Sequence, residues 1–296
     1  MARDYYGGIE TDKVGELGIG YVRFYDMADE KKYLEAGVRC AKALAENVRQ
    51  GDASRTPGPF RVDARTGEVP VNGQYGGMIV APVRLFDEVM RLNAGDVETF
   101  RAARGLAGKW LLSYPPNLSS TAHDRWAMYF EDVNYTPDNV NQASSPMTAN
   151  YIPSRPDPAG VDPQWDRHVG RAIDFLKQRF GKGPYLCAWA IDEQTVCYSR
   201  AGLGSDTSPW AAIDAMYYEK TGDAQAREDA FRSLNYATYF AASDGMIACC
   251  GANYTSPYWF DDGYSDYSRN FSWAMGAVPA FAPQGENHLL RSTSVV

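Results

Sequence analysis

The sequence is poor in the residues that most often mark metal, redox and disulfide chemistry. It holds three histidines and five cysteines: Cys40, Cys187, Cys197, Cys249 and Cys250. An odd number of cysteines cannot pair completely within one chain. No CxxC motif occurs, and the adjacent Cys249 and Cys250 suit neither one disulfide nor one metal ion. We therefore expect free thiols in a reducing compartment, no metal and no cofactor.

The motifs of several enzyme classes are missing as well. No GxxxxGK[ST], HExxH or GxSxG occurs, which counts against P-loop nucleotide binding, zinc proteolysis and the α/β-hydrolase elbow. "GELGIG" at 15–20 begins a helical run and is a weak match to dinucleotide-binding glycines. A Ser–His–Asp triad without the elbow and a Ca²⁺ ion in the Asp-rich loops stay open.

Long apolar runs and basic patches are also lacking. The net charge is −8 with a sequence pI of about 5.0, and such a surface repels phosphate backbones. "DEKKY" at 29–33 is mixed in sign and predicts a helix start. No stretch approaches the ~18 apolar residues of a membrane span, and the first residues resemble no signal peptide. We expect no nucleic-acid or membrane partner and a cytoplasmic location, with a secreted or periplasmic parent as the alternative.

What the sequence does contain is helical periodicity. In 31–48 apolar residues recur at steps of three and four, and an apolar content of 45% is ample for a packed core. Alternating strand patterns are scarce, and 59–67 is predicted to be one short hairpin arm. Asp206 or Ser208 is expected to cap a following helix. The predicted helices cover 31–48, 76–92, 97–114, 165–180, 185–198, 210–220 and 224–240.

The connections between these helices alternate between tight and long. Tight connections are predicted at 27–30, 93–96, 181–184 and 221–223, and long irregular ones at 50–73, 115–123, 153–163, 199–208 and 244–258. Antiparallel helices joined in this way place tight turns at one end and long loops at the other, where a site can form.

This rhythm predicts an all-α fold, a closed (α/α)6-type toroid of helical hairpins that forms one domain over residues 1–296. Twelve full helices usually need a longer chain, so one hairpin is expected to be short or missing. "TGDAQAREDAFRSLNYATYF" (221–240) resembles the hairpin return of the six-hairpin glycosidase-like superfamily, which includes glycoside hydrolases, polysaccharide lyases and sugar epimerases. The alternative architecture is an open helical solenoid, but the helix pairs share no fixed-period consensus.

A segment at 258–276 mixes aromatic rings with acids. On a helix it would place Tyr264 on a packing stripe and Asp262 and Asp266 on another. Aromatic rings stack on sugar rings while carboxylates bind hydroxyls, so this mixture predicts a polar cleft. The alternative is a packing helix whose N-terminus is capped by Asp261 and Asp262. Trp259, Tyr264, Arg269 and Trp273 are the predicted substrate-binding residues of this segment.

Three further clusters bring acids or amides next to rings at predicted long loops. Their candidate catalytic residues are Glu131, Asp132, Asp192 and Glu193, and their candidate substrate-binding residues are Gln74, His123, Trp126 and Tyr129. Together with Asp262 and Asp266, these acids predict a paired Asp/Glu hydrolase that cleaves the glycosidic bonds of an oligo- or polysaccharide. The resemblance implies inversion at the anomeric carbon.

Other functions remain open at this point. A polysaccharide lyase would abstract the proton next to a uronate carboxylate, for which Tyr264, Tyr267, Arg269, Asn270, His123 and Asn141 are candidates. A carbohydrate-binding toroid without catalysis would keep the rings but not the paired acids. The resemblance implies histidines for a sugar epimerase, and the scarcity of histidine, with His168 expected to have a packing or surface role, disfavours that activity. The oligomeric state is left open.

Overall fold

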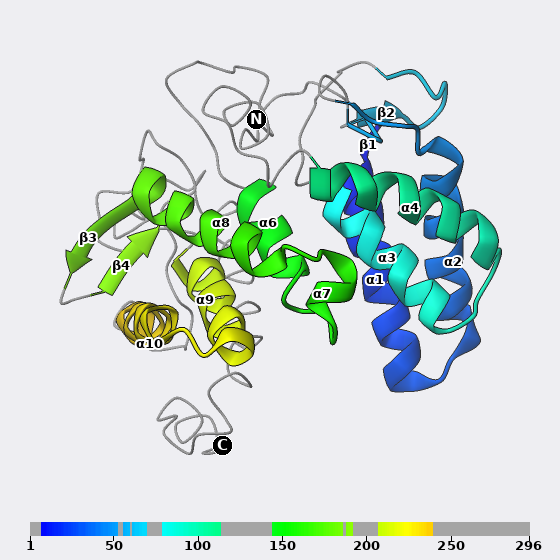
Figure 1. Cartoon of the computed structure of the whole chain (residues 1–296). Helices are drawn as coiled ribbons and strands as arrows, with labels where there is room; N and C mark the ends of the chain where they lie inside the picture. Colours follow the sequence, from blue (N-terminus) through cyan, green and yellow to red (C-terminus); the bar gives the residue numbers. More distant parts are fainter. Residues whose placement is uncertain are drawn as a thin grey trace, which may run out of the picture. The chain divides into compact units, whose positions relative to one another are not determined.

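The computed structural model of the chain describes residues 7–52, 56–59, 61–69, 79–113, 144–185, 188–191 and 207–238 (Figure 1). It divides into two compact units, Met1–Asn134 (unit 1) and Tyr135–Val296 (unit 2). Unit 1 contains β1 (Gly8–Glu10), α1 (Thr11–Ala28), α2 (Lys31–Asn47), β2 (Arg61–Asp63), α3 (Val80–Arg91) and α4 (Val97–Ser113). Unit 2 contains α6 (Ser144–Tyr151), α7 (Pro158–Val161), α8 (Trp165–Phe180), β3 (Gly181–Tyr185), β4 (Ala188–Ile191), α9 (Thr207–Thr221) and α10 (Ala224–Thr238).

Unit 1 is built from two helical hairpins that share one core. Small residues on α1 allow close approach, since a Cβ atom on Gly15 would lie 2.7 Å from the backbone of Ala81 at the start of α3. The Phe86 and Phe100 rings stack at 6.2 Å between α3 and α4. The core buries apolar side chains from all four helices: Val22, Ala41, Leu44, Leu85, Phe86, Val89, Phe100 and Ala103. The helix predictions at 31–48 and 97–114 are confirmed almost to the residue.

In unit 1 the short connections lie at one end and the long connection after α2 lies at the other, as predicted. At one end, α1 meets α2 through Asp29 and Glu30, and α3 meets α4 through residues 92–96. At the other end, the Thr11 hydroxyl donates to the Pro59 carbonyl at 2.8 Å, and the Trp110 indole nitrogen donates to the Asp52 carbonyl at 2.9 Å. The start of α1 and the end of α4 therefore lie beside the connection that follows α2. We call this end the loop end of unit 1.

A two-stranded sheet covers part of the loop end. β1 and β2 pair antiparallel, with Glu10 opposite Arg61 and Gly8 opposite Asp63. The strand predicted within 59–67 is thus confirmed as β2, and its partner immediately precedes α1. This pairing fixes where α1 begins.

Unit 2 packs α8, α9 and α10 against a β-hairpin. α8 and α9 run antiparallel, because the Trp165 ring lies edge-on to Tyr217 and the Trp210 indole donates to the Ile173 carbonyl at 3.2 Å. A tight turn at residues 222 and 223 joins α9 to α10, as predicted. The buried residues Ala211, Ala212, Ala215, Ala230 and Leu234 form the contact between these two helices.

The sequence-based assignment of 181–198 is wrong in its described part. The predicted tight turn 181–184 belongs to β3, and the helix predicted from 185 is replaced by β4, which pairs antiparallel with β3. The short apolar run "AWAI" shows neither a helical nor a strand period. Ala188, Ala190 and Ile191 are buried and Trp189 is half-buried, because β4 packs against α8, α9 and α10. The capping role offered to Ser208 is also wrong, since α9 begins at Thr207 and Ser208 is buried inside its first turn.

In unit 2 the loop end holds β3–β4, the start of α9 and the end of α8. The Thr207 hydroxyl accepts a hydrogen bond from the Ile191 N–H at 3.0 Å, so the chain leaves β4 and re-enters α9 at neighbouring points. The connection between α6 and α8, however, lies at the start of α8, beside the tight turn at 222–223. The prediction that every long loop lies at one end is therefore wrong for 153–163. That Pro-rich segment is also the long connection that lacks an acid–aromatic cluster.

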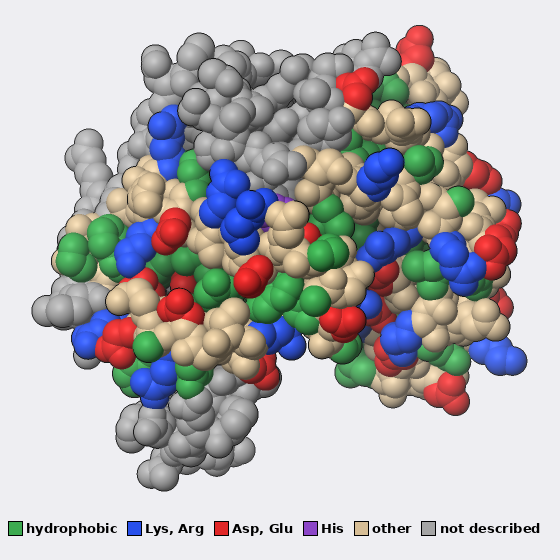
Figure 2. Space-filling model, viewed as in Figure 1, with side chains coloured by type: hydrophobic (Ala, Val, Ile, Leu, Met, Phe, Trp, Pro, Cys, Tyr) green, Lys and Arg blue, Asp and Glu red, His purple; other side chains and the backbone are tan. Residues whose placement is uncertain are grey.

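On the face drawn in Figure 2, basic and acidic side chains are interspersed over the described residues of each unit. None of the described helices combines the length and apolarity needed to cross a bilayer.

Candidate functional site

The side chains predicted from the sequence to form the site all lie outside the described residues. They are the acids Glu131, Asp132, Asp192, Glu193, Asp262 and Asp266 and the binding residues Gln74, His123, Trp126, Tyr129, Trp259, Tyr264, Arg269 and Trp273. These assignments remain predictions. The structure does describe the residues that precede two of these segments. Ile191, directly before Asp192, is fully buried, and α4 ends at Ser113, before the segment that contains Glu131.

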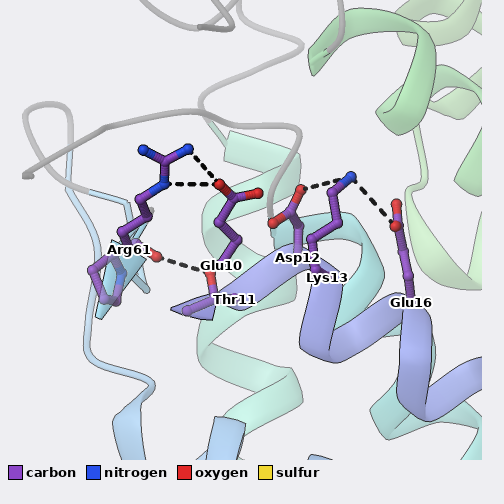
Figure 3. A network of polar contacts seen from close by, with 7 residues as sticks. Glu10, Thr11, Asp12, Lys13, Glu16 and Arg61 are labelled. Carbon is purple, nitrogen blue, oxygen red and sulfur yellow. Dashed lines mark hydrogen bonds and ion pairs between the residues drawn. The ribbon is translucent and has the colours of Figure 1, made fainter. Parts of the chain in front are cut away.

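A cluster of charged side chains occupies the loop end of unit 1, around the first turn of α1 (Figure 3). Arg61 Nε and Nη2 lie 2.8 and 2.6 Å from Glu10 Oε1, and both side chains are largely buried. Lys13 Nζ lies 3.7 Å from Asp12 Oδ2 and 3.5 Å from Glu16 Oε2. Two paired strands that are far apart in sequence and one helix thus bring three carboxylates and two cations together.

Within this cluster, Asp12 is the carboxyl held least firmly in its ionised form. Its side chain is 7% exposed, and Oδ1 is buried without a hydrogen-bond partner among the described residues. Burial raises the pKa of Asp12 to about 6, and the nearby Lys13 only partly opposes this effect. A carboxyl with such a pKa keeps its proton part of the time near neutral pH, which is what a general acid needs.

A second cluster lies in unit 2, centred on Lys177 in the last turn of α8. Lys177 Nζ lies 2.6 Å from Asp229 Oδ2, 5.0 Å from the centroid of the Trp189 ring and 6.0 Å from that of Trp210. Gln225 donates to the other oxygen of Asp229 at 3.0 Å. Asp229 is therefore bound by a cation and an amide, and the lysine lies close to two aromatic faces.

Asp214 of α9 faces the same cluster without joining it. It is fully buried, and neither of its carboxylate oxygens has a hydrogen-bond partner within the described part of the chain. Burial is the first cause that raises the pKa of Asp214 well above its usual value, and the charge of Asp229 adds to it, while Lys177 opposes both. Burial in the helical core therefore favours the protonated form of Asp214.

His168 has a structural role at the opposite end of unit 2. Its Nδ1 lies 2.6 Å from Asp162 Oδ2, and both side chains are buried. The other oxygen of Asp162 accepts from the Gln164 N–H at 3.0 Å, so this pair fixes the entry into α8. The expected packing role of His168 is confirmed.

Metal-binding and thiol chemistry find little support in the described residues. No group of three or more His, Cys, Asp or Glu side chains in these ranges is arranged to hold a metal ion. Cys40 is a free thiol, and burial raises its pKa, which disfavours a reactive thiolate.

Sequence reasoning missed Asp12, Lys177 and Asp214. Asp214 had a visible signal, an acid inside the apolar stretch Trp210–Met216. Asp12 had none, because an aspartate in the first turn of a helix is common and favoured by the helix dipole. Its burial is a tertiary property that no local pattern reveals.

Comparison with known proteins identifies the fold. No family model matches the sequence, and a search of curated proteins also finds no match. Among solved structures, a sugar epimerase from a ruminal bacterium is 10% identical with a TM-score of 0.61, over 93% of this chain and 76% of that chain. A D-mannose isomerase is 8% identical with a TM-score of 0.58, over 95% and 78%. A family 76 glycoside hydrolase from a bovine Bacteroides thetaiotaomicron strain is 11% identical with a TM-score of 0.57, over 94% and 57%.

At these identities the similarity shows the fold alone. The same fold covers nearly the whole of this chain in each comparison, and the described helices form antiparallel hairpins as that fold requires. The chain is therefore a mostly helical protein with the (α/α)6 toroid fold that these sugar-processing enzymes share.

Proposed function

We propose that this chain is a carbohydrate-active enzyme that hydrolyses glycosidic bonds of an oligo- or polysaccharide. The fold that it shares with a sugar epimerase, a sugar isomerase and a glycoside hydrolase carries this proposal. Loops collected at one end of paired helices are where such a fold has room for a site, and each unit has such an end. Because fold alone does not establish chemistry, the proposal also rests on the acids and rings predicted along these loops.

The proposed chemistry needs two carboxyl groups on either side of the scissile bond. One protonates the leaving oxygen, and the other activates water or attacks the anomeric carbon. Glu131 and Asp132 of unit 1, and Asp192, Glu193, Asp262 and Asp266 of unit 2, are the candidates that the sequence supplies. Aromatic side chains in the same segments would stack on the apolar faces of the sugar.

Sugar isomerisation or epimerisation is the second candidate. Two observations favour it: the epimerase and the isomerase have slightly higher TM-scores than the hydrolase, and more of each of those two chains is matched. Against it, His168 is buried against Asp162, which leaves His123 and His288 for a reaction that is expected to use histidine. β-Elimination on a uronate and binding without catalysis also remain as alternatives.

A panel of sugars separates these reactions in one experiment. The purified chain is incubated with oligo- and polysaccharides, and three signals are followed: new reducing ends, ultraviolet absorbance of an unsaturated uronate, and new anomeric or epimeric NMR signals without change of mass. Hydrolysis predicts the first signal alone. Growth of the second or third signal without the first would replace hydrolysis by elimination or isomerisation, and no signal with any sugar would remove catalysis.

Variants then test the predicted acids. Glu131→Gln and Asp266→Asn are each expected to lower turnover by roughly 100-fold or more, because each removes a carboxyl from acid–base chemistry. The matched control is Glu98→Gln, whose side chain is 82% exposed in the first turn of α4. Unchanged turnover in either variant would remove that residue from the site.

A further inference from the structure

The first turn of α1 presents a buried carboxyl at the loop end of unit 1. Asp12 is the second residue of α1, directly after Thr11, whose hydroxyl is tied to the Pro59 carbonyl. The connection after α2 and the end of α4 lie at the same end. Asp12 therefore lies at the end of unit 1 from which the connections after α2 and α4 depart.

The acids in the cluster around Asp12 differ in how closely a cation contacts them. Glu10 is bound to Arg61 by two contacts below 3 Å. Asp12 has a longer contact of 3.7 Å, to a lysine that also lies 3.5 Å from Glu16. Its Oδ1 has no hydrogen-bond partner among the residues that the structure describes.

A buried polar atom without a partner is costly, because it loses its contacts to water and gains nothing in return. For a carboxyl the cost is smaller when it carries a proton, and burial accordingly raises the pKa of Asp12 to about 6. Asp12 thus combines a buried oxygen that has no partner among the described residues with a position at the loop end, and this combination is typical of an acid that takes part in a reaction.

We propose that Asp12 is the proton donor of the sugar-cleaving reaction, an inference that rests on the proposed hydrolase function. The glycosidic C–O bond breaks as the Asp12 proton passes to the leaving oxygen, which becomes a hydroxyl. Water adds to the anomeric carbon and gives its proton to the second carboxylate that the proposed hydrolysis requires. Solvent returns a proton to Asp12 and removes one from the base, so the net reaction consumes one water.

The test compares Asp12→Asn on two substrates of the sugar that the panel identifies. The natural oligosaccharide needs a proton on its leaving oxygen, whereas the 2,4-dinitrophenyl glycoside has a leaving group stable as an anion. The variant is expected to lose roughly 10²–10⁴-fold in turnover on the oligosaccharide and less than about tenfold on the dinitrophenyl glycoside. The matched control is Asp26→Asn, at the other end of α1, where Asp26 is 42% exposed.

Each result decides the inference. An equal loss on both substrates would assign Asp12 a structural role, and no loss would remove it from the reaction. A wild-type chain that only isomerises sugars would overturn the donor role while keeping a sugar-processing activity, and inactivity on all sugars would overturn the proposed function itself. Infrared difference spectra of wild-type and Asp12→Asn protein give an independent readout, since a carboxyl that titrates near pH 4 would also overturn the proposal.

Discussion

Asp12 and Asp214 are two buried carboxyls with raised pKa values, yet they lie in different surroundings. Asp12 is in the first turn of α1, at the end where long connections leave unit 1, and its side chain keeps 7% of its surface exposed. Asp214 is in the middle of α9 and fully buried by its own unit. Desolvation is the largest cause in both, so a raised pKa alone does not identify a catalytic acid.

Access separates the two residues. A general acid must reach its substrate, and Asp12 lies at a loop end, while Asp214 lies between α8 and α10. The groups around Asp214 are Asp174 and Lys177 from α8, Asp229 from α10 and Asp223 from the turn before it. We therefore interpret Asp12 as a functional acid and Asp214 as a structural one, and the predictions below test that contrast.

The largest expected effect is on the pH dependence of turnover. The activity of a protonated acid is lost as pH rises through its pKa, so wild-type turnover is expected to fall above about pH 6, the value to which burial raises the pKa of Asp12. Asp12→Asn should remove this limb along with most of the activity, and Asp214→Asn should leave it in place. A limb that disappears in the Asp214 variant would reverse the two roles.

The next effect concerns Lys177, the cation beside Asp214. Lys177→Met leaves Asp229, whose side chain is 8% exposed, without its cation and should lower the free energy of unfolding by about 3 kcal/mol. Denaturant unfolding at pH 7 measures this, and the double variant Lys177→Met, Asp229→Asn should recover part of the loss. The control is Arg232→Met in the exposed pair with Glu228, expected to cost under about 1 kcal/mol. Equal losses at Lys177 and Arg232 would contradict the importance of the buried pair.

A third effect is the pH dependence of stability from Asp214. Because its pKa is raised in the folded state, the folded protein binds one more proton than the unfolded chain above about pH 4. Stability should therefore fall as pH rises, by about 1.4 kcal/mol per pH unit, until the folded-state pKa is passed. Asp214→Asn should lack this slope. Parallel curves of unfolding free energy against pH for the two proteins would show that Asp214 is ionised in the fold.

The smallest effect is expected at an exposed carboxylate of α1. Asp26 pairs with Arg91 at 2.7 Å, with both side chains over 40% exposed. Asp26→Asn should change the unfolding free energy by less than about 1 kcal/mol, because solvent screens such pairs. Thermal unfolding in low and high salt measures this. A larger loss of unfolding free energy would mean that this exposed acid contributes as much to stability as a buried one.

Much of the helical framework could be predicted from the sequence. The boundaries of α2, α4 and α8 follow from apolar residues at steps of three and four, and the tight turns at 29–30 and 222–223 from their polar and glycine residues. The hairpin β3–β4 could not be predicted, since a short apolar run is buried equally well as a strand or a helix. The position of the 153–163 connection depended on the direction of α8, which only tertiary contacts reveal.

The candidate site was less accessible to sequence reasoning. The rings and acids in the predicted long loops are neighbours along the sequence, so this feature could be recognised without a structure. The two residues directly before Asp12 contact positions about fifty residues away, since Thr11 bonds to Pro59 and Glu10 to Arg61, and Asp214 lies near charged groups of α8 and α10. Such long-range burial decides which acids hold a proton, and no spacing pattern records it.

Hydrogen exchange with and without the sugar found in the panel tests most directly whether the loop ends bind substrate. The account predicts slower amide exchange in the connections at the loop ends, 48–79, 114–143 and 192–206, because bound sugar would reduce their opening. The connections at 29–30, 92–96 and 152–164 should exchange at unchanged rates. Protection confined to this second group would contradict a site at the loop ends.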